Sequence, residues 1–442
     1  MIDAEPTKTF FVDMLTRDIP LEQAILDLVD NSVDGAKAMA LPADKPFDQR
    51  KVVLEFDANR FRIWDNCGGF SRAAARDYAF KFGRPPASQA PRTSHSIGQF
   101  GVGMKRALFK FGEEFVVRSA TKDDVWAVKV DVPTWETEAG WHFPWEPFDG
   151  NEHVSPQAPG TEIIVTNLRA EVGRRFATSV FQNSIFELIK SKHRQFIAGG
   201  LSVSVNGKHV DAIDLGLLVQ DGFTPGSRVI KFQEEGQAEV SVRIIAAVGA
   251  SVPRQAGWYV VCNGRVVLEA DRSTVTGWGL IEDAVNRPVV PSFHNQFARF
   301  RGLIFFDSAD SARVPWNTTK TNVDQDTPIW QATFPIMIEL MRPVIDFLNE
   351  LDADIDEHSR EESPLLKFVN KSQTVKPETI TSSVTFRAPQ RSSFAKGPKT
   401  TKIQYSKTVD DIEFLQQELG VSSARAVGEK TFDLVLKRQR GQ

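Results

Sequence analysis

The sequence predicts an α+β protein in which two domains, each a sheet with helices, precede a polar segment and a short helical end. A helical apolar pattern at residues 21–39 is followed by two strand patterns, KVVLEF at 51–56 and NRFRIWDN at 59–66. Two Asn-Gly dipeptides, at 206–207 and 263–264, stand between alternating runs, which indicates hairpins. From residue 364 to residue 407 the chain becomes polar, with many Ser, Thr and Lys residues.

The composition restricts the class of protein. A chain of 442 residues, 41% hydrophobic and 25% charged, predicts two or three soluble domains at about 150 residues each. Its two cysteines, Cys67 and Cys262, exclude a disulfide framework and a four-thiolate zinc site, and they favour a cytoplasmic location. No apolar run approaches the roughly 18 to 20 residues of a membrane span, so no membrane partner is expected.

Further patterns divide the chain. Strand patterns at FVVRSA, VWAVKV and TEIIVTNL belong to the first domain, and a long helical pattern at 326–351 closes the second. The expected units are a first domain, a second domain, a connector, a polar linker and a helical module, at residues 1–175, 176–350, 351–363, 364–407 and 408–442. The linker holds nine lysines and arginines against one glutamate, a net charge of +8, although the whole chain has a net charge of -4.

The first candidate chemistry lies on the helix at 21–39. Asp27, Asn31 and Asp34 follow one another at i, i+4 and i+7, which puts them on one helix face, and Asp30 borders that face. The neighbouring residues are apolar almost all round, so these polar side chains would face a polar cavity. An amide oxygen there could hold Mg²⁺ and a carboxylate could orient water. The alternative is a solvated acidic face.

A second candidate is Asp65, which ends the strand pattern in IWDNCGGF (63–70). Its carboxylate is suited to accept a hydrogen bond from the exocyclic amine of adenine. Gly68 and Gly69 would let the backbone approach a base or ribose closely. An ordinary tight turn explains the same residues.

The third candidate is a glycine segment, residues 98–103, followed by Lys105 and a helical pattern. Gly98, Gly101 and Gly103 would free backbone N–H groups to surround an anion, and the helix start and Lys105 would add positive charge. A flexible hinge is the alternative. The preceding residues 81–96 have the composition of a mobile lid.

With Gly160-Thr161 at the start of a later strand, these motifs resemble, in order and spacing, those of the GHKL ATPases of the gyrase, heat-shock-chaperone, histidine-kinase and MutL types. The resemblance implies an α/β sandwich of the Bergerat type at the N-terminus. The second half, with WYVVCNGRVV and VPWNTTKTNVD, is similar to the ribosomal-protein-like transducer domain of MutL and MORC proteins, and Lys320 stands where their phosphate-reaching lysine lies.

The resemblance also implies roles for individual residues, with ATP and Mg²⁺ as the ligands. Asn31 would hold Mg²⁺, Asp27 would orient the attacking water, and Lys320 would contact the γ-phosphate as a second catalytic residue. Asp65 and Thr161 would read adenine. The full set expected to bind the nucleotide is Asn31, Asp34, Asp65, Gly69, Gly98, Gln99, Phe100, Gly101, Val102, Gly103, Lys105 and Thr161.

Two positions depart from the family pattern. Asp27 stands where the family usually has a glutamate, which is one methylene longer, so slow hydrolysis is expected. Cys67 stands where the first glycine of the motif is common, so a less permissive turn is expected there. The predicted function is an ATP-dependent switch with domain closure and a nucleotide-dependent homodimer, acting on DNA in genome maintenance or phage defence, for which the basic linker is the support. A chaperone-like ATPase with a protein client and a non-hydrolysing interaction module remain the alternatives.

Overall fold

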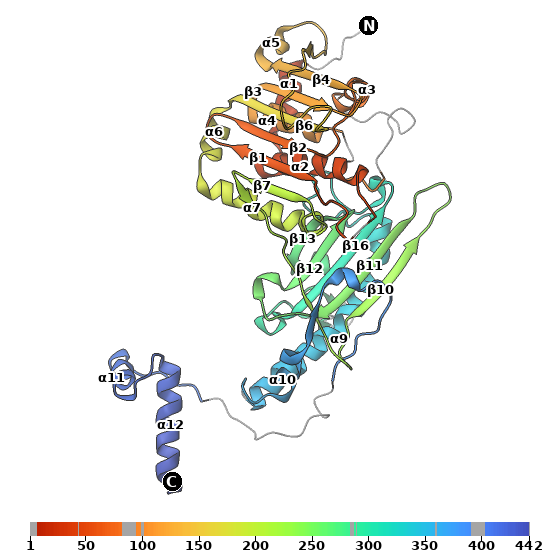
Figure 1. The fold of residues 1–442 in the computed structure, drawn as a ribbon. Helices are drawn as coiled ribbons and strands as arrows, with labels where there is room; N and C mark the ends of the chain where they lie inside the picture. The colour runs from red at the N-terminus through yellow and green to blue at the C-terminus, as the bar shows by residue number, and fades with distance from the viewer. Residues whose placement is uncertain are drawn as a thin grey trace.

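The computed structural model describes residues 7–42, 44–81, 94–98, 101–282, 287–288, 290–358, 360–389 and 403–441. The fold is α+β, as predicted, with two mixed sheets in succession and two helices at the C-terminal end (Figure 1). The first sheet has eight strands in the order β5-β4-β3-β6-β2-β1-β7-β8. Its strands are β1 Lys51–Phe56, β2 Phe61–Asp65, β3 Gly112–Ala120, β4 Val125–Asp131, β5 Trp145–Glu146, β6 Gly160–Leu168, β7 Ser202–Val205 and β8 Lys208–His209.

Helices cover one face of this sheet. The helix α2 packs against α4, and α1 packs against α4 as well (Figure 1). Phenylalanines and aliphatic side chains of these helices and of the strands form one buried core. The helices of the first domain are α1 Lys8–Arg17, α2 Leu21–Ala38, α3 Arg72–Ala74, a π-helix Ala75–Ala79, α4 Gly103–Phe111, α5 Val132–Thr137, α6 Ala170–Phe176, α7 Ser179–Lys192 and α8 Arg194–Ala198.

The first sheet extends further along the chain than residue 175. β7 pairs with β1 in parallel and β8 pairs with β7, so residues up to 209 belong to this sheet. The helices α6, α7 and α8 lie between β6 and β7 in the chain and bring β7 back to the sheet parallel to β1. The expected boundary at 175 therefore falls inside the first sheet. The sequence could not show this, because the alternation of apolar residues identifies a strand but not the strand with which it pairs.

The second sheet has five strands in the order β10-β11-β16-β12-β13. The strands are β10 Gly226–Phe232, β11 Val240–Val248, β16 Phe300–Ser308, β12 Gly257–Cys262 and β13 Arg265–Asp271. Residues of β11 alternate between two cores: Val242, Ile244 and Ala246 lie in the main core, whereas Ile245 and Ala247 lie in a smaller one on the opposite face. Both faces are therefore buried.

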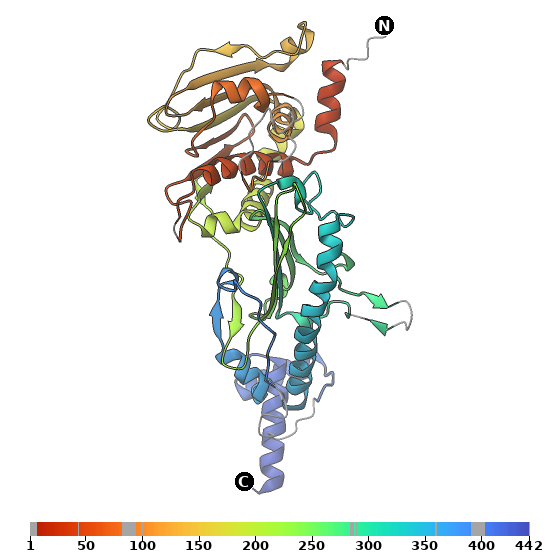
Figure 2. The same cartoon turned by 90° about the vertical axis from the view of Figure 1, so that its right-hand side faces the viewer.

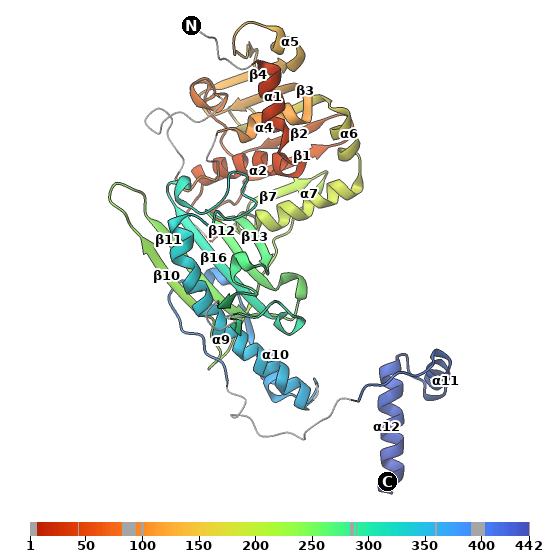
Figure 3. The ribbon, with the colours of Figure 1, turned by 180° about the vertical axis from the view of Figure 1, so that it is seen from behind.

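The long helix α9, Pro328–His358, packs along one face of the second sheet (Figures 2 and 3). It is one helix through Pro335 and Pro343, and it takes in most of the expected connector at 351–363. The short pairs β9 Leu217–Val219 with β17 Gln373–Val375, and β14 Ile281–Glu282 with β15 Arg287–Pro288, complete the strands.

Residues 364–389, expected to be the first part of a linker, instead fold back on the second domain. Pro364–Lys371 form the helix α10, with Leu365, Leu366 and Val369 buried. β17 then pairs with β9, and the following residues bridge to the start of β10, where Ser227 pairs with Val384. A few apolar side chains placed at the right spacing hold this segment, although its average composition is polar.

The helices α11 Val409–Leu419 and α12 Ala424–Arg440 pack on each other, and they lie apart from the two sheets in Figure 1. They form the two short helices that the sequence predicts at this end. Over the described ranges of the chain, no helix combines the length and the apolar character that a membrane span requires.

Candidate functional site

The polar face of α2 opens onto a site. Asp27 is buried, whereas Asn31 is exposed, although the residues on both sides of it are buried. An exposed amide in the middle of a buried helix faces a solvent-filled space. Among the described residues, the Asn31 side chain has no hydrogen-bonding partner. Its amide oxygen can therefore bind a ligand.

The glycine segment lies directly against this face. A Cβ atom at Gly103 would stand 3.2 Å from Oδ2 of Asp27, and one at Gly98 would stand 3.2 Å from Oδ2 of Asp34 and 3.8 Å from Oδ1 of Asn31. Side chains at these two positions would therefore crowd the carboxylates. The two glycines and α2 thus form a polar cradle, and Gly103 is also the first residue of α4.

Gly101 has a positive φ of 66°, which suits glycine, and Val102 precedes the first residue of α4. Gln99 and Phe100, also expected to bind the nucleotide, lie outside the described residues, as do residues 82–93, most of the expected lid. The described part of the glycine segment is therefore Gly98 with 101–103.

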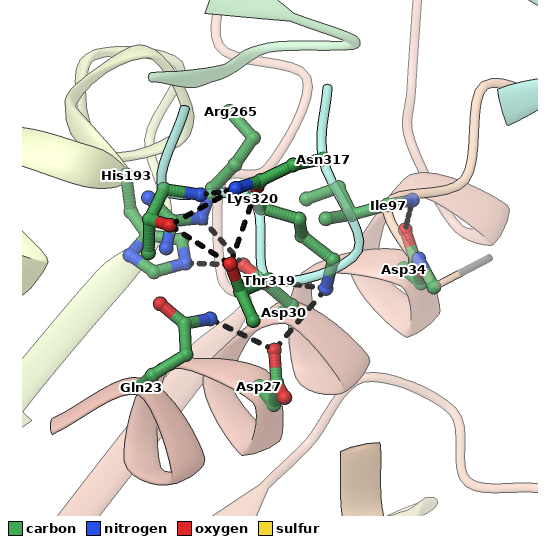
Figure 4. Close-up of polar contacts among 12 residues, drawn as sticks. Gln23, Asp27, Asp30, Asp34, Ile97, His193, Arg265, Asn317, Thr319 and Lys320 are labelled. Carbon is green, nitrogen blue, oxygen red and sulfur yellow. Dashed lines mark hydrogen bonds and ion pairs between the residues drawn. The ribbon is translucent and has the colours of Figure 1, made fainter. Parts of the chain in front are cut away.

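Asp34 holds the protein chain rather than facing the open space. Its carboxylate accepts hydrogen bonds from the N–H groups of Ile97 (2.7 Å) and Gly98 (2.8 Å) (Figure 4). Burial raises the pKa of Asp34, against the opposing charge of Lys37 and these two hydrogen bonds. Asp34 therefore fixes the glycine segment to α2, and a direct nucleotide contact remains a prediction.

Lys320 reaches the same face from the second domain. Its ammonium group lies 2.8 Å from Oδ2 of Asp30 and 3.3 Å from Oδ1 of Asp27 (Figure 4). Burial alone would lower the pKa of Lys320, but the charges of Asp30 and Asp27 outweigh it and raise the pKa. The structure thus brings together the two residues expected to be catalytic, which are 293 positions apart in the sequence.

Asp30 is the centre of a buried polar cluster. Besides Lys320, it contacts Nε of Arg265 at 2.9 Å and Nε2 of His193 at 2.8 Å. Burial would raise the pKa of Asp30, but Lys320 and Arg265 hold it well below its ordinary value. Burial and the charge of Arg265 lower the pKa of His193 to about 4, so the imidazole is neutral near pH 7. The cluster joins α2 to the second sheet.

Sequence reasoning did not assign roles to Asp30, His193 and Arg265, and it missed Gln23. The Nε2 atom of Gln23 donates a hydrogen bond of 3.0 Å to Oδ1 of Asp27. Gln23 precedes Asp27 by four residues, the spacing at which helical side chains meet, and this spacing could have identified it. Together Gln23 and Lys320 fix one oxygen of Asp27, and Oδ2 lies toward Gly103.

Asp65 lies at the other end of the site. Its carboxylate accepts hydrogen bonds from Oγ of Ser32 on α2 (2.7 Å) and from N–H of Cys67 (2.9 Å). Burial raises the pKa of Asp65, opposed by the hydrogen bonds from Cys67, Ser32 and the backbone of Thr161. The hydroxyl of Thr161 lies 3.1 Å from that of Ser119. The sequence-predicted pair Asp65 and Thr161 therefore does meet.

Gly69 has a packing role in the structure. Its φ is +61°, and a Cβ atom there would overlap the carbonyl oxygens of Ala120 and Gly160. Gly160 is equally confined, because a Cβ on it would overlap the carbonyl oxygen of Asp65. These glycines let the turn after β2 approach β3 and β6, and a contact of Gly69 with a ligand remains a prediction.

Lys105 is placed differently from what the sequence suggested. Its ammonium group donates hydrogen bonds to the carbonyl oxygens of Ala79 (2.7 Å) and Lys81 (2.6 Å). Burial lowers the pKa of Lys105 to about 7. In this arrangement the lysine fastens the end of the π-helix and the residues after it, and a phosphate contact of Lys105 remains a prediction.

Comparison with known proteins supports the interpretation of this site as a nucleotide-binding site. Residues 19–161 match the family model described as "Histidine kinase-, DNA gyrase B-, and HSP90-like ATPase". The matched region contains α2, the turn after Asp65, the glycine segment and the first two residues of β6. The search of curated proteins returned no match. Over residues 19–161 the chain is therefore similar to the GHKL-type ATPase domains, the class that binds ATP.

Proposed function

We propose that the protein is an ATP-driven switch that binds Mg·ATP on the polar face of α2, hydrolyses it slowly, and couples the nucleotide state to the orientation of its second domain. The observation that carries the proposal is the contact of Lys320 with Asp27 and Asp30. A cation from the second domain lies in the first domain's site, so a change in the site's charge acts on both domains.

The residues present fit the expected ligands. Beside the glycine cradle, Asn31 offers an amide oxygen that has no partner within the part of the chain that the structure describes. Carboxylates and amides are the ligands that Mg²⁺ prefers. When bound there, Mg²⁺ would supply charge neutralisation on the phosphates. Asp65 and Thr161 would fix the adenine, with Asp65 kept in position by Ser32 and Cys67.

Asp27 supplies the acceptor for the attacking water. Gln23 and Lys320 occupy one of its oxygens and Oδ2 remains on the side of Gly103. A γ-phosphate that attracts the ammonium group would release Asp27 and stabilise charge on the transferring group at the same time.

Phosphate release tests the enzymatic part. Wild-type protein should release phosphate from ATP slowly in the presence of Mg²⁺, and Asp27→Asn should not. Binding of ATP without any phosphate release in the wild type would favour a non-hydrolysing interaction module.

The same assay also tests the partner of the protein. We propose a homodimer that forms with the triphosphate and acts on nucleic acid, as in MutL-like and MORC-like proteins, and the basic residues between 391 and 407 support the nucleic-acid partner. Duplex DNA should then stimulate phosphate release, and a non-hydrolysable ATP analogue should shift the protein to a dimer in size-exclusion chromatography. Stimulation by unfolded protein instead of DNA would favour the chaperone-like alternative.

A further inference from the structure

The segment that leads into the glycine cradle is held by both domains. Residues 95–98, here called the anchor segment, are bound to α2 through Asp34, and Lys37 of the same helix donates a hydrogen bond of 2.7 Å to the carbonyl oxygen of His95. Ser96 and Ile97 are buried. The anchor segment therefore has a fixed place on the first domain.

The second domain supplies the other contacts. Asn263 lies in the tight turn between β12 and β13, and its Nδ2 atom donates hydrogen bonds to the carbonyl oxygens of Ser96 (3.2 Å) and Ser308 (3.1 Å). Its Oδ1 atom accepts a hydrogen bond from the N–H of Ser308 at 2.9 Å. Its carbonyl oxygen accepts a hydrogen bond from Lys37 at 2.7 Å. The N–H of His95 also donates to the carbonyl oxygen of Ala309.

These bonds give Asn263 more than the role of a turn residue. Its φ of +47° and the following Gly264 at +84° satisfy the turn through the backbone alone. The side chain is only 3% exposed, and it bonds outside the turn, to the end of β16 and to the anchor segment. A shift of this turn would displace the residues immediately before the cradle.

We propose that Asn263 is a positioning residue by which the second domain sets the place of the glycine segment, and hence the retention of the nucleotide. The consequence for the nucleotide rests on the proposed function, because it requires that Gly98, beside Asn31, lines the nucleotide site. The Asn263 amide would hold Ser96, and through Ser96 the N–H groups that Asp34 fixes. Movement of the second domain would loosen the cradle without any change in the residues that touch the ligand.

The chain contains a matched control for this proposal. Asn206 occupies the equivalent Asn-Gly turn between β7 and β8, with φ of +46°. Its amide is also bonded to backbone, accepting from N–H of Phe56 (2.9 Å) and donating to the carbonyl oxygen of Phe56 (3.1 Å). Its hydrogen bonds go to Phe56 and Leu54 of β1, and none joins it to the anchor segment or to α2, all of whose residues the structure describes. Substitution by glycine keeps a positive φ available at both positions and removes the amide alone.

The experiment compares full-length wild type, Asn263→Gly and Asn206→Gly. Hydrogen exchange of the amides of Ile97 and Gly98 should accelerate about tenfold in Asn263→Gly, the effect of one lost hydrogen bond, and should stay near wild type in Asn206→Gly. Dissociation of a fluorescent ATP analogue with Mg²⁺ should accelerate by a similar factor in Asn263→Gly only. Asn263→Asp, which keeps the acceptor for Ser308 but loses both donated bonds, should behave like Asn263→Gly.

Equal exchange at Ile97 and Gly98 in the two glycine variants would overturn the positioning role. Faster exchange with unchanged nucleotide dissociation would overturn the link to nucleotide retention. If the wild type binds no nucleotide at all, the proposed function fails, whereas the exchange comparison still decides whether Asn263 holds the anchor segment.

Discussion

Three polar residues on one face of α2 have different roles because their surroundings differ. Asn31 is exposed, and its side chain has no hydrogen-bonding partner among the described residues. One oxygen of Asp27 accepts hydrogen bonds from Gln23 and Lys320. Both oxygens of Asp34 accept hydrogen bonds from backbone N–H groups. The i, i+4, i+7 spacing predicts that they share a face. It cannot separate the roles, because Asp34 is bound by the backbone of residues 97–98 and Asp27 is bound by a lysine of the second domain as well as by Gln23 of its own helix.

Substitution of Asn31 and Asp27 should therefore have separate effects. We expect Asn31→Ala to abolish Mg-dependent nucleotide binding, because it removes the exposed amide oxygen beside the glycine cradle. Asp27→Asn should leave binding near wild type and remove turnover, because the amide is a poorer acceptor for water. Calorimetric titration with Mg·ATP and phosphate release measure the two effects.

Asn349→Ala is a suitable control for Asn31→Ala, because Asn349 is an exposed asparagine within a helix of the second domain, α9. It should bind Mg·ATP as the wild type does. Normal Mg·ATP affinity in Asn31→Ala would contradict the assignment of Asn31 as metal ligand.

The neutral state of His193 predicts a pH dependence of stability. Its pKa is about 4 in the folded chain and 6.5 ordinarily, so between these values the unfolded chain binds more protons. The stability from this group is present above about pH 6.5 and is lost as the pH falls toward 4, at up to roughly 1.4 kcal/mol per pH unit. Denaturant unfolding of wild type and His193→Gln measures this, since the glutamine amide can still donate to Asp30 and does not titrate. Parallel stability profiles of the two proteins over this range would refute the prediction.

At the scale of elements, the loop between β16 and α9 holds Lys320 in the position from which it contacts Asp27 and Asp30. Oδ1 of Asn317 accepts hydrogen bonds from the N–H groups of Thr321 (3.0 Å) and Asn322 (3.3 Å), and the N–H of Lys320 donates to the carbonyl oxygen of Asn317. Lys320 itself has a φ of +55°, which is uncommon for a residue with a side chain. The loop thus presents a fixed cation to α2.

Removal of this cation should affect the triphosphate and not the diphosphate. In Lys320→Ala we expect ADP affinity near wild type, because the lysine would contact the γ-phosphate alone, and we expect hydrolysis to fall by about two to three orders of magnitude. Asp30 keeps Arg265 and His193 as partners in this variant. Calorimetry with ADP and phosphate release with ATP measure the two outcomes, and Thr321→Ala in the same loop is the control. An equal loss of ADP binding would show that the loop, and not the charge, had been damaged.

The hairpins illustrate what the sequence can predict of such elements. Both Asn-Gly dipeptides form tight turns with positive φ, because this local chemistry is written in two adjacent residues. The parallel pairing of β7 with β1 and the bond of Asn263 to Ser96 join residues more than 140 positions apart. Local periodicity carries no signal for such pairs, so the sheet order and the cluster around Asp30 could not be predicted from it.

For the whole molecule, residues 364–389 of the polar segment belong to the folded second domain. Phe223 lies in contact with Phe368 and Phe386, at ring-centroid distances of 6.0 and 6.4 Å, and Thr224 bridges to Arg387. A chain that ends at Ser363 loses these contacts, whereas one that ends at Pro389 keeps them. The apolar side chains of residues 364–389 attach this segment to the second domain. The average composition of residues 364–407 is polar and does not reveal them.

Truncation should separate folding from function. We expect the chain 1–363 to melt several degrees lower than the intact protein, since it uncovers Phe223 and leaves β9 without its partner β17. The chain 1–389 should melt close to the intact protein. Calorimetric melting of the three chains checks this, and equal melting temperatures for 1–363 and 1–389 would mean that residues 364–389 contribute no stability.

If the protein acts on nucleic acid, the chain 1–389 should also show where DNA binds. Lys367, within the ordered part of the segment, is paired with Glu362, whereas the basic residues from Arg391 to Lys407 have no acidic residue among them in the sequence. Basic side chains that neutralise phosphates release counterions, so affinity for duplex DNA should fall steeply with salt in the intact protein. The chain 1–389 should keep basal phosphate release and lose this binding, as measured by fluorescence anisotropy between low and physiological salt. If it binds duplex DNA as tightly as the intact protein, residues 390–407 are a spacer for α11 and α12, and the contact surface lies on the two sheet domains.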